Sequence, residues 1–309
     1  SHQGITGPLV IDSFQEWFSG VEEDEPFFAF VHLWDVHYDY TPPEEYDVFD
    51  PTYRGPIDGS DFQNLRIAAS QKKDLARLIS LYDGEILFTD KQVERLLTGL
   101  EVAGRLDNTL VILTSDHGEA FAEHRMLGHK HSLMEEELRV PLLMRLPGRI
   151  PAGRVVDDLA SLVDIVPTIH DFTGTPVPPG TWGRSLAPIA MGEVDDLEPR
   201  PAPIELTTRY NGRVQRGLRW QDDKFVDRGE GFRRVHLDLV KDPGEYYPVH
   251  ENDADRPPIF GERLAEAEDL WQRMDANRPR RDDSEALPTG LSDDLEAHGY
   301  MGGEEDAED

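Results

Sequence analysis

The chain has 309 residues, of which 62 are Asp or Glu and 31 are Lys or Arg, so its formal net charge is −31. A surface this acidic repels nucleic acid and anionic lipid, which excludes both classes of partner. The sequence contains no cysteine, so it can form neither disulfides nor thiolate metal sites. It also lacks the run of about 18 apolar residues that a membrane-spanning helix needs.

The basic residues are unevenly distributed between the two types, because only six of the 31 are lysines. An acidic, lysine-poor surface suits a halophilic host, where high salt screens the repulsion between carboxylates. A GC-rich codon bias is the alternative explanation. The first residues lack an initiator Met and the pattern of a signal peptide. We therefore expect a piece of a longer protein and leave its localisation open.

The first hundred residues alternate between helical and strand-like patterns. Apolar residues at helical spacing predict a helix over residues 9–18, and a continuous apolar run predicts a buried strand over residues 26–34. Residues 61–100 are predicted to be mostly helical. The side chains expected on the core-facing stripe of that helix are Ile79, Tyr82, Ile86, Val93, Leu96 and Leu97.

The same alternation continues to about residue 174. Buried strands are predicted over residues 108–116 and 140–146, with a short helix over 132–138 between them. Residues 156–174 have helical periodicity that stops at Gly174. This succession predicts an α/β fold with a doubly wound, mostly parallel sheet.

Beyond Pro179 the apolar runs become shorter and are separated by turn sequences, which predicts antiparallel hairpins followed by a helix over residues 259–274. We therefore predict an α/β core over residues 1–178 and a smaller antiparallel sheet-and-helix subdomain over residues 179–300. Residues 301–309 are predicted to be an acidic, disordered tail.

Two predicted strands end in polar side chains suited to a metal. Asp35 and His37 follow the first strand, and Asp116 and His117 follow the second, where Gly118 permits a sharp turn. In parallel sheets ligands bind beyond the carboxyl ends of the strands. Asp supplies an anionic oxygen and His a neutral nitrogen, and both can bind a divalent cation. The alternative is an Asp that caps the strand beside a solvated His.

A cationic turn follows. Lys130 lies between His129 and His131, shortly before the apolar sequence of the third strand. A lysine and two histidines in a turn that leads the chain back to the strand ends can form a pocket for an anionic ester. The alternative for these residues is a solvated turn.

The two segments TSDHGEAFAEH and LGHKHSLMEEELRVPLLMRLPG resemble the C-terminal half of the sulfatase family, within the alkaline-phosphatase-like superfamily. Further segments resemble that family in the family's own order along almost the whole chain. These segments are PFFAFVHLWDVHYDYTPPEEY, YDGEILFTDKQVERLL, DIVPTIHDFTG with WGRSLAPIAMG, LDLVKDPGEYYPV and LEAHGYMGG.

The resemblance assigns roles to four residues. Asp116 and His117 match two metal ligands of the family, whose divalent metal is usually Ca²⁺, with Mn²⁺ or Mg²⁺ as alternatives. His37 matches the histidine that contacts the sulfate or the leaving-group oxygen, and Lys130 matches the lysine that contacts a sulfate oxygen. Many sulfatases have Asn where this chain has His117, whereas phosphonate and phosphodiester hydrolases have His there.

The family's nucleophile is a formylglycine made from a C/S-x-P-S-R motif, and this sequence contains no such motif. The resemblance therefore implies the C-terminal part of a metal-dependent sulfatase, inactive alone, that as a full-length enzyme hydrolyses a sulfate monoester of a small molecule or carbohydrate. One alternative is a phosphodiester or phosphonate hydrolase, or a phosphoryl transferase, of the same superfamily. Another is a non-catalytic acidic binding protein. The oligomeric state is left open.

Overall fold

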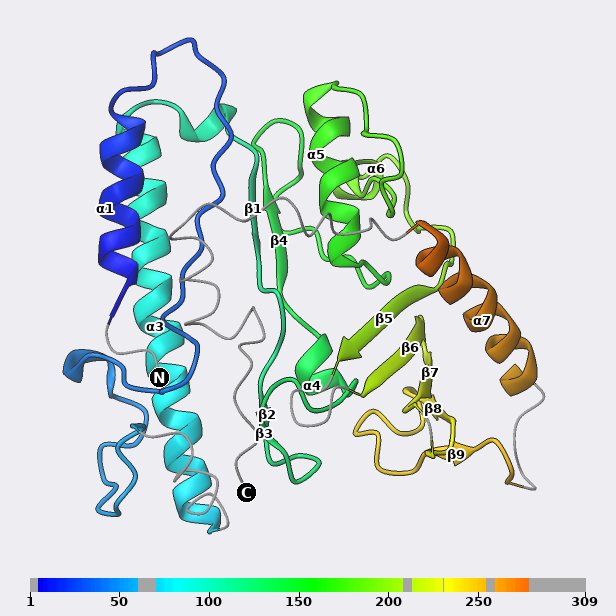
Figure 1. Cartoon of the computed structure of the whole chain (residues 1–309). Helices are drawn as coiled ribbons and strands as arrows, with labels where there is room; N and C mark the ends of the chain where they lie inside the picture. The colour runs from blue at the N-terminus through cyan, green and yellow to red at the C-terminus, as the bar shows by residue number, and fades with distance from the viewer. Residues whose placement is uncertain (1–4, 61–70, 208–212, 230, 254–258, 278–309) are drawn as a thin grey trace, which may run out of the picture. The chain divides into compact units, whose positions relative to one another are not determined.

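The structure is a computed structural model that describes residues 5–60, 71–207, 213–229, 231–253 and 259–277. The chain divides into two compact units, one of residues 1–104 with 279–309 and the other of residues 105–278 (Figure 1). The domain boundary predicted at residue 178 stays a prediction. The predicted acidic tail, residues 301–309, lies outside the described residues.

The first unit is built on two helices. The predicted helix over residues 9–18 is confirmed as α1 (Gly7–Phe18), which has a proline in its first turn, where the missing N–H is not needed. It buries Ile11 and Phe14 and packs along the long helix α3 (Lys72–Val102). A one-turn helix, η1 (Glu44–Tyr46), also packs on α3.

The helix predicted over residues 61–100 is confirmed from Lys72 onward, while residues 61–70 lie outside the described residues. The predicted core-facing stripe is wrong for Ile86, and its other five members are half-buried. None of its members is fully buried, and Ile86 is 44% exposed. The buried face instead includes polar residues, which a hydropathy pattern does not assign to the core. Their burial is possible because ion pairs and hydrogen bonds compensate for the loss of contact with water. That face comprises Asp74, Arg77, Leu78, Ser80, Leu81, Gly84, Glu85, Phe88, Gln92 and Leu100.

The strand predicted over residues 26–34 is not formed. This segment has no regular secondary structure, and its aromatic side chains Phe28 and Phe30 are 72% and 82% exposed. A strand requires a partner to accept and donate its ladder hydrogen bonds, and the described residues supply none. Apolar content alone is therefore not sufficient to form a strand here without a pairing partner.

The second unit begins with two strands that lie side by side in Figure 1, β1 (Val111–Thr114) and β4 (Leu142–Arg145). Both predicted strands are confirmed, but they pair antiparallel, with Val111 opposite Arg145. No parallel pair occurs among the described strands, so the predicted parallel sheet is not seen here. A parallel return needs a crossover, usually through a helix, and only a hairpin and a one-turn helix connect β1 to β4.

Short elements surround this pair. The helix predicted over 156–174 is confirmed only from residue 162 onward, as η3 and α5. It stops at Gly174, which adopts the left-handed conformation that ends many helices (φ 68°). The helix predicted over 132–138 is confirmed as the single turn α4. The remaining bounds are η2 (Leu106–Asn108), β2 (Ala120–Phe121), β3 (Leu127–Gly128), α4 (Glu135–Leu138), η3 (Leu162–Asp164), α5 (Ile165–Thr173) and α6 (Ala187–Met191).

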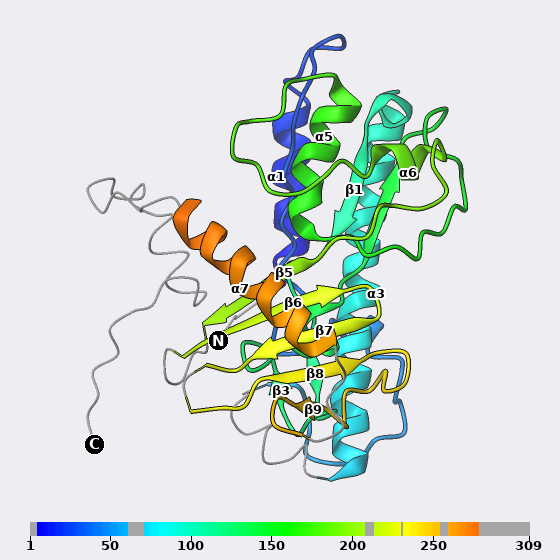
Figure 2. The same ribbon diagram turned by 90° about the vertical axis from the view of Figure 1, so that its right-hand side faces the viewer.

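The predicted C-terminal hairpins form one antiparallel sheet of five consecutive strands, β5 (Ala202–Thr207), β6 (Val214–Trp220), β7 (Asp223–Asp227), β8 (Val235–Asp238) and β9 (Val249–His250). The final helix, α7 (Ile259–Asn277), crosses this sheet (Figure 2). It packs Phe260 and Trp271 onto Leu218 and Phe225. The other face of the sheet packs on Leu133, close to the Lys130 turn.

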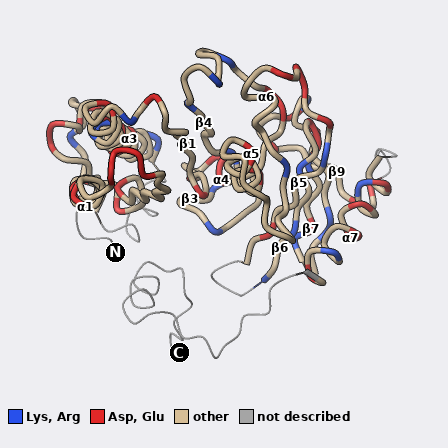
Figure 3. The backbone as a smooth tube through the Cα atoms, turned by 90° about the horizontal axis from the view of Figure 1, so that it is seen from above, with Lys and Arg blue, Asp and Glu red and all other residues tan. Residues whose placement is uncertain are grey.

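The charges are spread over the whole chain. Acidic residues occur along most elements of both units rather than in one patch (Figure 3). Among the described helices, including the longest one, α3, none combines the length and the apolar character needed to cross a lipid bilayer.

Candidate functional site

Asp116 and His117 lie immediately after β1, as predicted, in a turn held by hydrogen bonds. Ser115 Oγ donates to the His117 carbonyl at 2.8 Å, and the His117 backbone N–H donates to Asp116 Oδ1 at 3.1 Å. His117 Nδ1 lies 2.8 Å from the Gly118 carbonyl, which can only accept, so Nδ1 carries the proton. The unprotonated Nε2 is then available as a metal ligand.

The geometry of this pair fits two ligands of one cation. His117 Nε2 and Asp116 Oδ2 are 3.7 Å apart, a separation that two donor atoms about 2.0 to 2.6 Å from a shared ion can have. In the part of the chain that the structure describes, no cluster of three or more His, Asp or Glu side chains could hold a metal. Asp116 and His117 therefore fit as a partial ligand set.

His129 supports the ring of His117. The two imidazoles stack with their centroids 4.0 Å apart, and His129 Nδ1 lies 3.2 Å from the carboxylate of Glu119. Burial, with Lys130 and His117 nearby, lowers the pKa of His129 to about 3. His129 is therefore neutral at physiological pH and adds no positive charge beside His117.

Lys130 follows the small β2–β3 hairpin and has a positive φ of 66°, which is unusual for a residue with a side chain. The backbone on its C-terminal side is held by Glu137. One carboxylate oxygen accepts from His131 N at 3.1 Å, and the other accepts from Ser132 N at 3.0 Å and Ser132 Oγ at 2.7 Å. Three donors on one buried carboxylate fix the conformation of the turn that presents Lys130.

Glu137 also holds the turn of the metal-ligand pair. Its carbonyl accepts from Gly118 N at 2.8 Å. A Cβ at position 118 would lie 2.2 Å from the Glu136 carbonyl oxygen, so this close approach requires glycine. The Asp116–His117 turn and the Lys130 turn are thus connected through one residue.

A buried ion pair fixes α4 on the C-terminal sheet. Lys224 is completely buried, and its Nζ contacts the carboxylate of Glu245 and lies 3.0 Å from Glu135 Oε1 and 2.7 Å from the Leu133 carbonyl. The second Glu245 oxygen accepts from Glu135 N at 2.7 Å. This network connects β7 and the Glu245 loop to the segment that carries Glu137.

Asp116, His117 and Lys130 line one groove of about 1240 Å³ within the second unit. The groove extends past Arg154 to Arg219 and Gln221. Its volume is sufficient for a carbohydrate-sized ligand. The structure therefore places three of the four predicted site residues on one groove.

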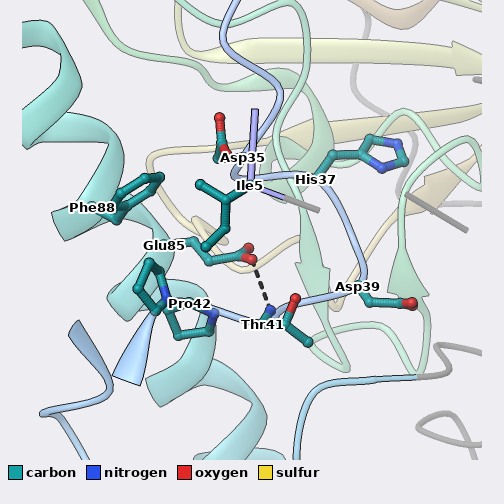
Figure 4. A pocket seen from close by; sticks show the side chains of 9 residues that line it. Ile5, Asp35, His37, Asp39, Thr41, Pro42, Glu85 and Phe88 are labelled. Carbon is teal, nitrogen blue, oxygen red and sulfur yellow. Dashed lines mark hydrogen bonds between the residues drawn. The ribbon is translucent and has the colours of Figure 1, made fainter. Parts of the chain in front are cut away.

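The fourth predicted residue, His37, lies in the first unit, so its placement beside Lys130 stays a prediction. Its Nδ1 lies 2.9 Å from the Tyr38 carbonyl, and its ring stacks on Trp34 with the centroids 4.7 Å apart. Figure 4 shows the ring directed away from Glu85. The adjoining cavity of about 20 Å³ has room for about one water molecule, so it is not a substrate site.

Asp35 has a structural role in the first unit. Its Oδ1 accepts from Thr6 N at 2.6 Å and its Oδ2 from Thr6 Oγ at 3.1 Å, which holds the start of α1. A Cβ on Gly7 would lie 2.8 Å from Gln92 Cγ and 2.9 Å from Asp35 Oδ2, so these side chains would have to shift to admit one. The carboxylate at the end of the predicted strand is therefore already engaged by the main chain.

The family model for sulfatases matches residues 9–175, more than half of the chain. The chain belongs to the sulfatase family. A second model, for the C-terminal region of N-sulphoglucosamine sulphohydrolase, matches residues 122–257. The two matches together cover the Asp116–His117 turn, the Lys130 turn and the antiparallel sheet.

Among curated relatives, N-acetylglucosamine-6-O-sulfatase of Bacteroides thetaiotaomicron is 28% identical over 255 residues, which are 80% of this chain and 44% of that protein. Arylsulfatase K of Homo sapiens is 40% identical over 119 residues, covering 38% of this chain and 22% of that protein. The chain thus matches less than half the length of either relative.

Two solved structures have a similar fold. One, determined in complex with its substrate D-glucosamine-2-N,6-O-disulfate, superimposes with a TM-score of 0.71 at 21% identity, covering 93% of this chain and 72% of that one. The phosphonate monoester hydrolase of Agrobacterium radiobacter superimposes with a TM-score of 0.70 at 26% identity, covering 88% and 61% of the two chains.

Sequence patterns did not identify Glu137 or Glu119 as part of this region. Glu137 is the third residue of a three-glutamate run, which is typical of a solvated helix start. The position of the three glutamates between the Lys130 turn and the RVP sequence could have indicated that one of them contacts the turn. That position does not show which of the three is buried.

Proposed function

We propose that the protein is a sulfuric ester hydrolase that cleaves a sulfate monoester of a carbohydrate or other small molecule. The observation that carries the proposal is that Asp116, His117 and Lys130 line one groove in a chain of the sulfatase family. The sulfatase relatives and the structure with a bound sulfated glucosamine support the choice of ester and of alcohol.

Each residue has a role that its surroundings support. Lys130 provides a positive charge for the ester oxygens, and its turn is rigid, so little reorganisation is needed as negative charge develops in the transition state. Asp116 and His117 would hold a divalent cation, for which we propose Ca²⁺, with Mn²⁺ or Mg²⁺ as alternatives. When bound, the ion supplies further positive charge for the ester. We propose that His37 contacts the sulfate or the departing oxygen.

We also propose that the fold of the whole protein includes a mostly parallel sheet of the alkaline-phosphatase-like type. The exposed aromatic side chains of residues 26–34 support this, because strands buried on both faces of a parallel sheet have such continuous apolar sequences. The fold similarity to sulfatase structures supports it further.

A second candidate is phosphonate or phosphodiester hydrolysis. Two observations favour it, namely His117 at a position where many sulfatases have Asn, and the similarity to a phosphonate monoester hydrolase. The sequence of the gene on the 5′ side of the codon for Ser1 discriminates between the two. A C/S-x-P-S-R motif there supports the sulfatase, and a Thr or unmodified Ser nucleophile supports the phosphonate hydrolase.

The cation site is tested with Asp116→Ala in the full-length gene product. We expect release of sulfate from p-nitrophenyl sulfate to fall below detection, and the rise in melting temperature on adding Ca²⁺ to the EDTA-treated protein to disappear. Asp107→Ala, at an exposed carboxylate, is the matched control. Wild-type turnover by Asp116→Ala would contradict the assignment of this ligand.

A further inference from the structure

One face of the β6–β7 ladder packs against the residues that follow Lys130. Gln215 Nε2 donates to the His131 carbonyl at 3.1 Å, and Lys224 Nζ donates to the Leu133 carbonyl at 2.7 Å. Between them, the position of a Cβ on Gly217 lies 3.2 Å from Leu133 Cδ1. Alternate residues of a strand share a face, so this face carries the odd-numbered residues of β6 and the even-numbered residues of β7.

Two arginines continue the same face at the end nearest His131. Arg213 lies two residues before Gln215, about 7 Å along the strand. The ladder between β6 and β7 ends with Arg216 opposite Asp227, and Gln215 and Arg228 are the next residues of the two chain segments. The strands remain close beyond that point, because a Cβ on Gly229 would lie 2.7 Å from the Val214 carbonyl oxygen.

Two other cations on this face, Arg219 and Lys224, are paired with a carboxylate, whereas Arg228 is not. Arg219 and Lys224 share Glu135. The carboxylate next to Arg228, that of Asp227, lies on the opposite face and accepts from Arg234 Nε and Gly229 N, both at 2.9 Å. Among the residues that the structure describes, none forms an ion pair or hydrogen bond with the half-buried Arg228.

Arg213 approaches the residue that follows Arg228, because a Cβ on Gly229 would lie 3.1 Å from Arg213 Cγ. Arg213 stacks its guanidinium on the ring of Phe232, with Cζ 3.9 Å from the centroid, which fixes its orientation. Burial, and then the charge of Arg213, lower the pKa of Arg228. An anion that binds between two neighbouring arginines relieves the repulsion between their positive charges. Such a pair is unusual in a chain with a net charge of −31.

We propose that Arg213 and Arg228 bind a second oxyanion of the substrate, a sulfate or a carboxylate, while Lys130 contacts the ester to be cleaved. Guanidinium groups match both oxyanions with paired hydrogen bonds, and partial burial strengthens them. The preferred substrate is then a carbohydrate with at least two anionic groups. This inference rests on the proposed function for the role of Lys130.

The test is calorimetric titration of the full-length protein with glucosamine 6-sulfate and with glucosamine carrying both N- and 6-O-sulfate. We expect the disulfated sugar to bind at least tenfold more tightly to the wild type. Arg228→Gln and Arg213→Gln should remove this preference without weakening the monosulfated sugar, and Arg228→Lys should retain part of it. Arg273→Gln, at an exposed arginine of α7, is the matched control.

A 2-O-sulfated glucuronate, compared with the corresponding 2-O-sulfated glucose, shows whether a carboxylate serves as well as a sulfate. Melting temperatures show whether each variant is folded. If one of the two Gln variants does not fold, the other still tests the site. Absence of an arginine-dependent preference for either doubly charged sugar overturns the proposal.

Failure of the anion site and failure of the proposed function give different results. Hydrolysis of p-nitrophenyl sulfate without such a preference contradicts only the anion site. An arginine-dependent preference in a protein that releases no sulfate contradicts only the catalytic role, and it leaves an anionic-carbohydrate binding site.

Discussion

Around Lys130, the decisive contacts are made by the main chain and by Glu137, which lies seven residues further along the sequence. The Lys130 backbone adopts a left-handed conformation, and the next two residues donate to Glu137. A residue held in this way can present a charge without losing much conformational entropy on binding.

Lys130→Ala is expected to reduce kcat/KM for a sulfate ester about 100-fold, since it removes one fixed positive charge from the developing transition state. The melting temperature should change little, because the turn is held by Glu137. Steady-state kinetics and thermal unfolding measure the two effects, with the exposed Lys241→Ala as control. Unchanged kinetics would show that Lys130 lies in a solvated turn and does not contact the ester.

Glu137→Gln tests the residue that joins the two turns. The amide nitrogen of Gln cannot accept, so at least one of the three donors loses its partner, which we expect to reduce the free energy of unfolding by about 2 kcal/mol. Because both the Lys130 turn and the Gly118 turn depend on this segment, kcat should fall more than KM rises. Denaturant unfolding and kinetics of Glu137→Gln against Glu94→Gln, an exposed position, provide the comparison.

At the scale of elements, α3 shows how polar residues can form a buried helix face. Arg77 binds Asp47 through both terminal nitrogens, at 2.5 and 2.6 Å. Glu85 Oε1 accepts from Thr41 N at 2.8 Å, which Figure 4 shows as a contact from the helix to the neighbouring loop. These contacts allow the helix to bury ionisable side chains that hydropathy assigns to solvent.

Glu85 predicts a pH dependence of stability. Burial, with the carboxylates of Asp35 and Asp39 nearby, raises the pKa of Glu85 to about 9. The folded state therefore holds a proton that the unfolded state releases at about pH 4.5. The stability from this group is present below pH 4.5 and is lost as the pH rises toward 9, by up to about 1.4 kcal/mol per pH unit.

Glu85→Gln should remove this fall, because the amide stays neutral. We expect the variant to match the wild type near pH 5 and to be more stable at pH 8 by about 2 kcal/mol or more. Urea unfolding across this pH range measures the difference. Parallel profiles for wild type and Glu85→Gln would show that Glu85 is ionised in the folded protein.

At the scale of the whole molecule, the net charge of −31 is the dominant property. Acidic residues are distributed over both units, so each carboxylate has like-charged neighbours whose repulsion destabilises the compact state. Salt screens this repulsion, since the Debye length falls from about 10 Å at 0.1 M to about 3 Å at 1 M ionic strength.

We therefore expect the melting temperature to rise by about 5 °C or more between 0.1 and 1 M KCl. Thermal unfolding monitored by circular dichroism measures this. KCl and NaCl should act alike if screening is the cause, and a melting temperature independent of salt would contradict the halophilic interpretation of the composition.

Much of the local structure was predictable from the sequence. Periodicity identified α1, most of α3, β1, β4, α5, the C-terminal hairpins and α7, because each has a regular apolar pattern with turn residues at its ends. The Asp-His pair after β1 and the lysine turn were also identified, since charged side chains at strand ends and turns are visible without knowledge of packing.

The tertiary structure decided which surfaces these elements bury and how the site is held. The buried face of α3, the antiparallel pairing of β1 with β4 and the lack of a strand over residues 26–34 all depend on a partner supplied by distant residues. Glu137 and the Arg213–Arg228 pair depend on contacts across the turn and the ladder. A sequence pattern records local preference, whereas pairing and burial are set by contacts between residues far apart in the chain.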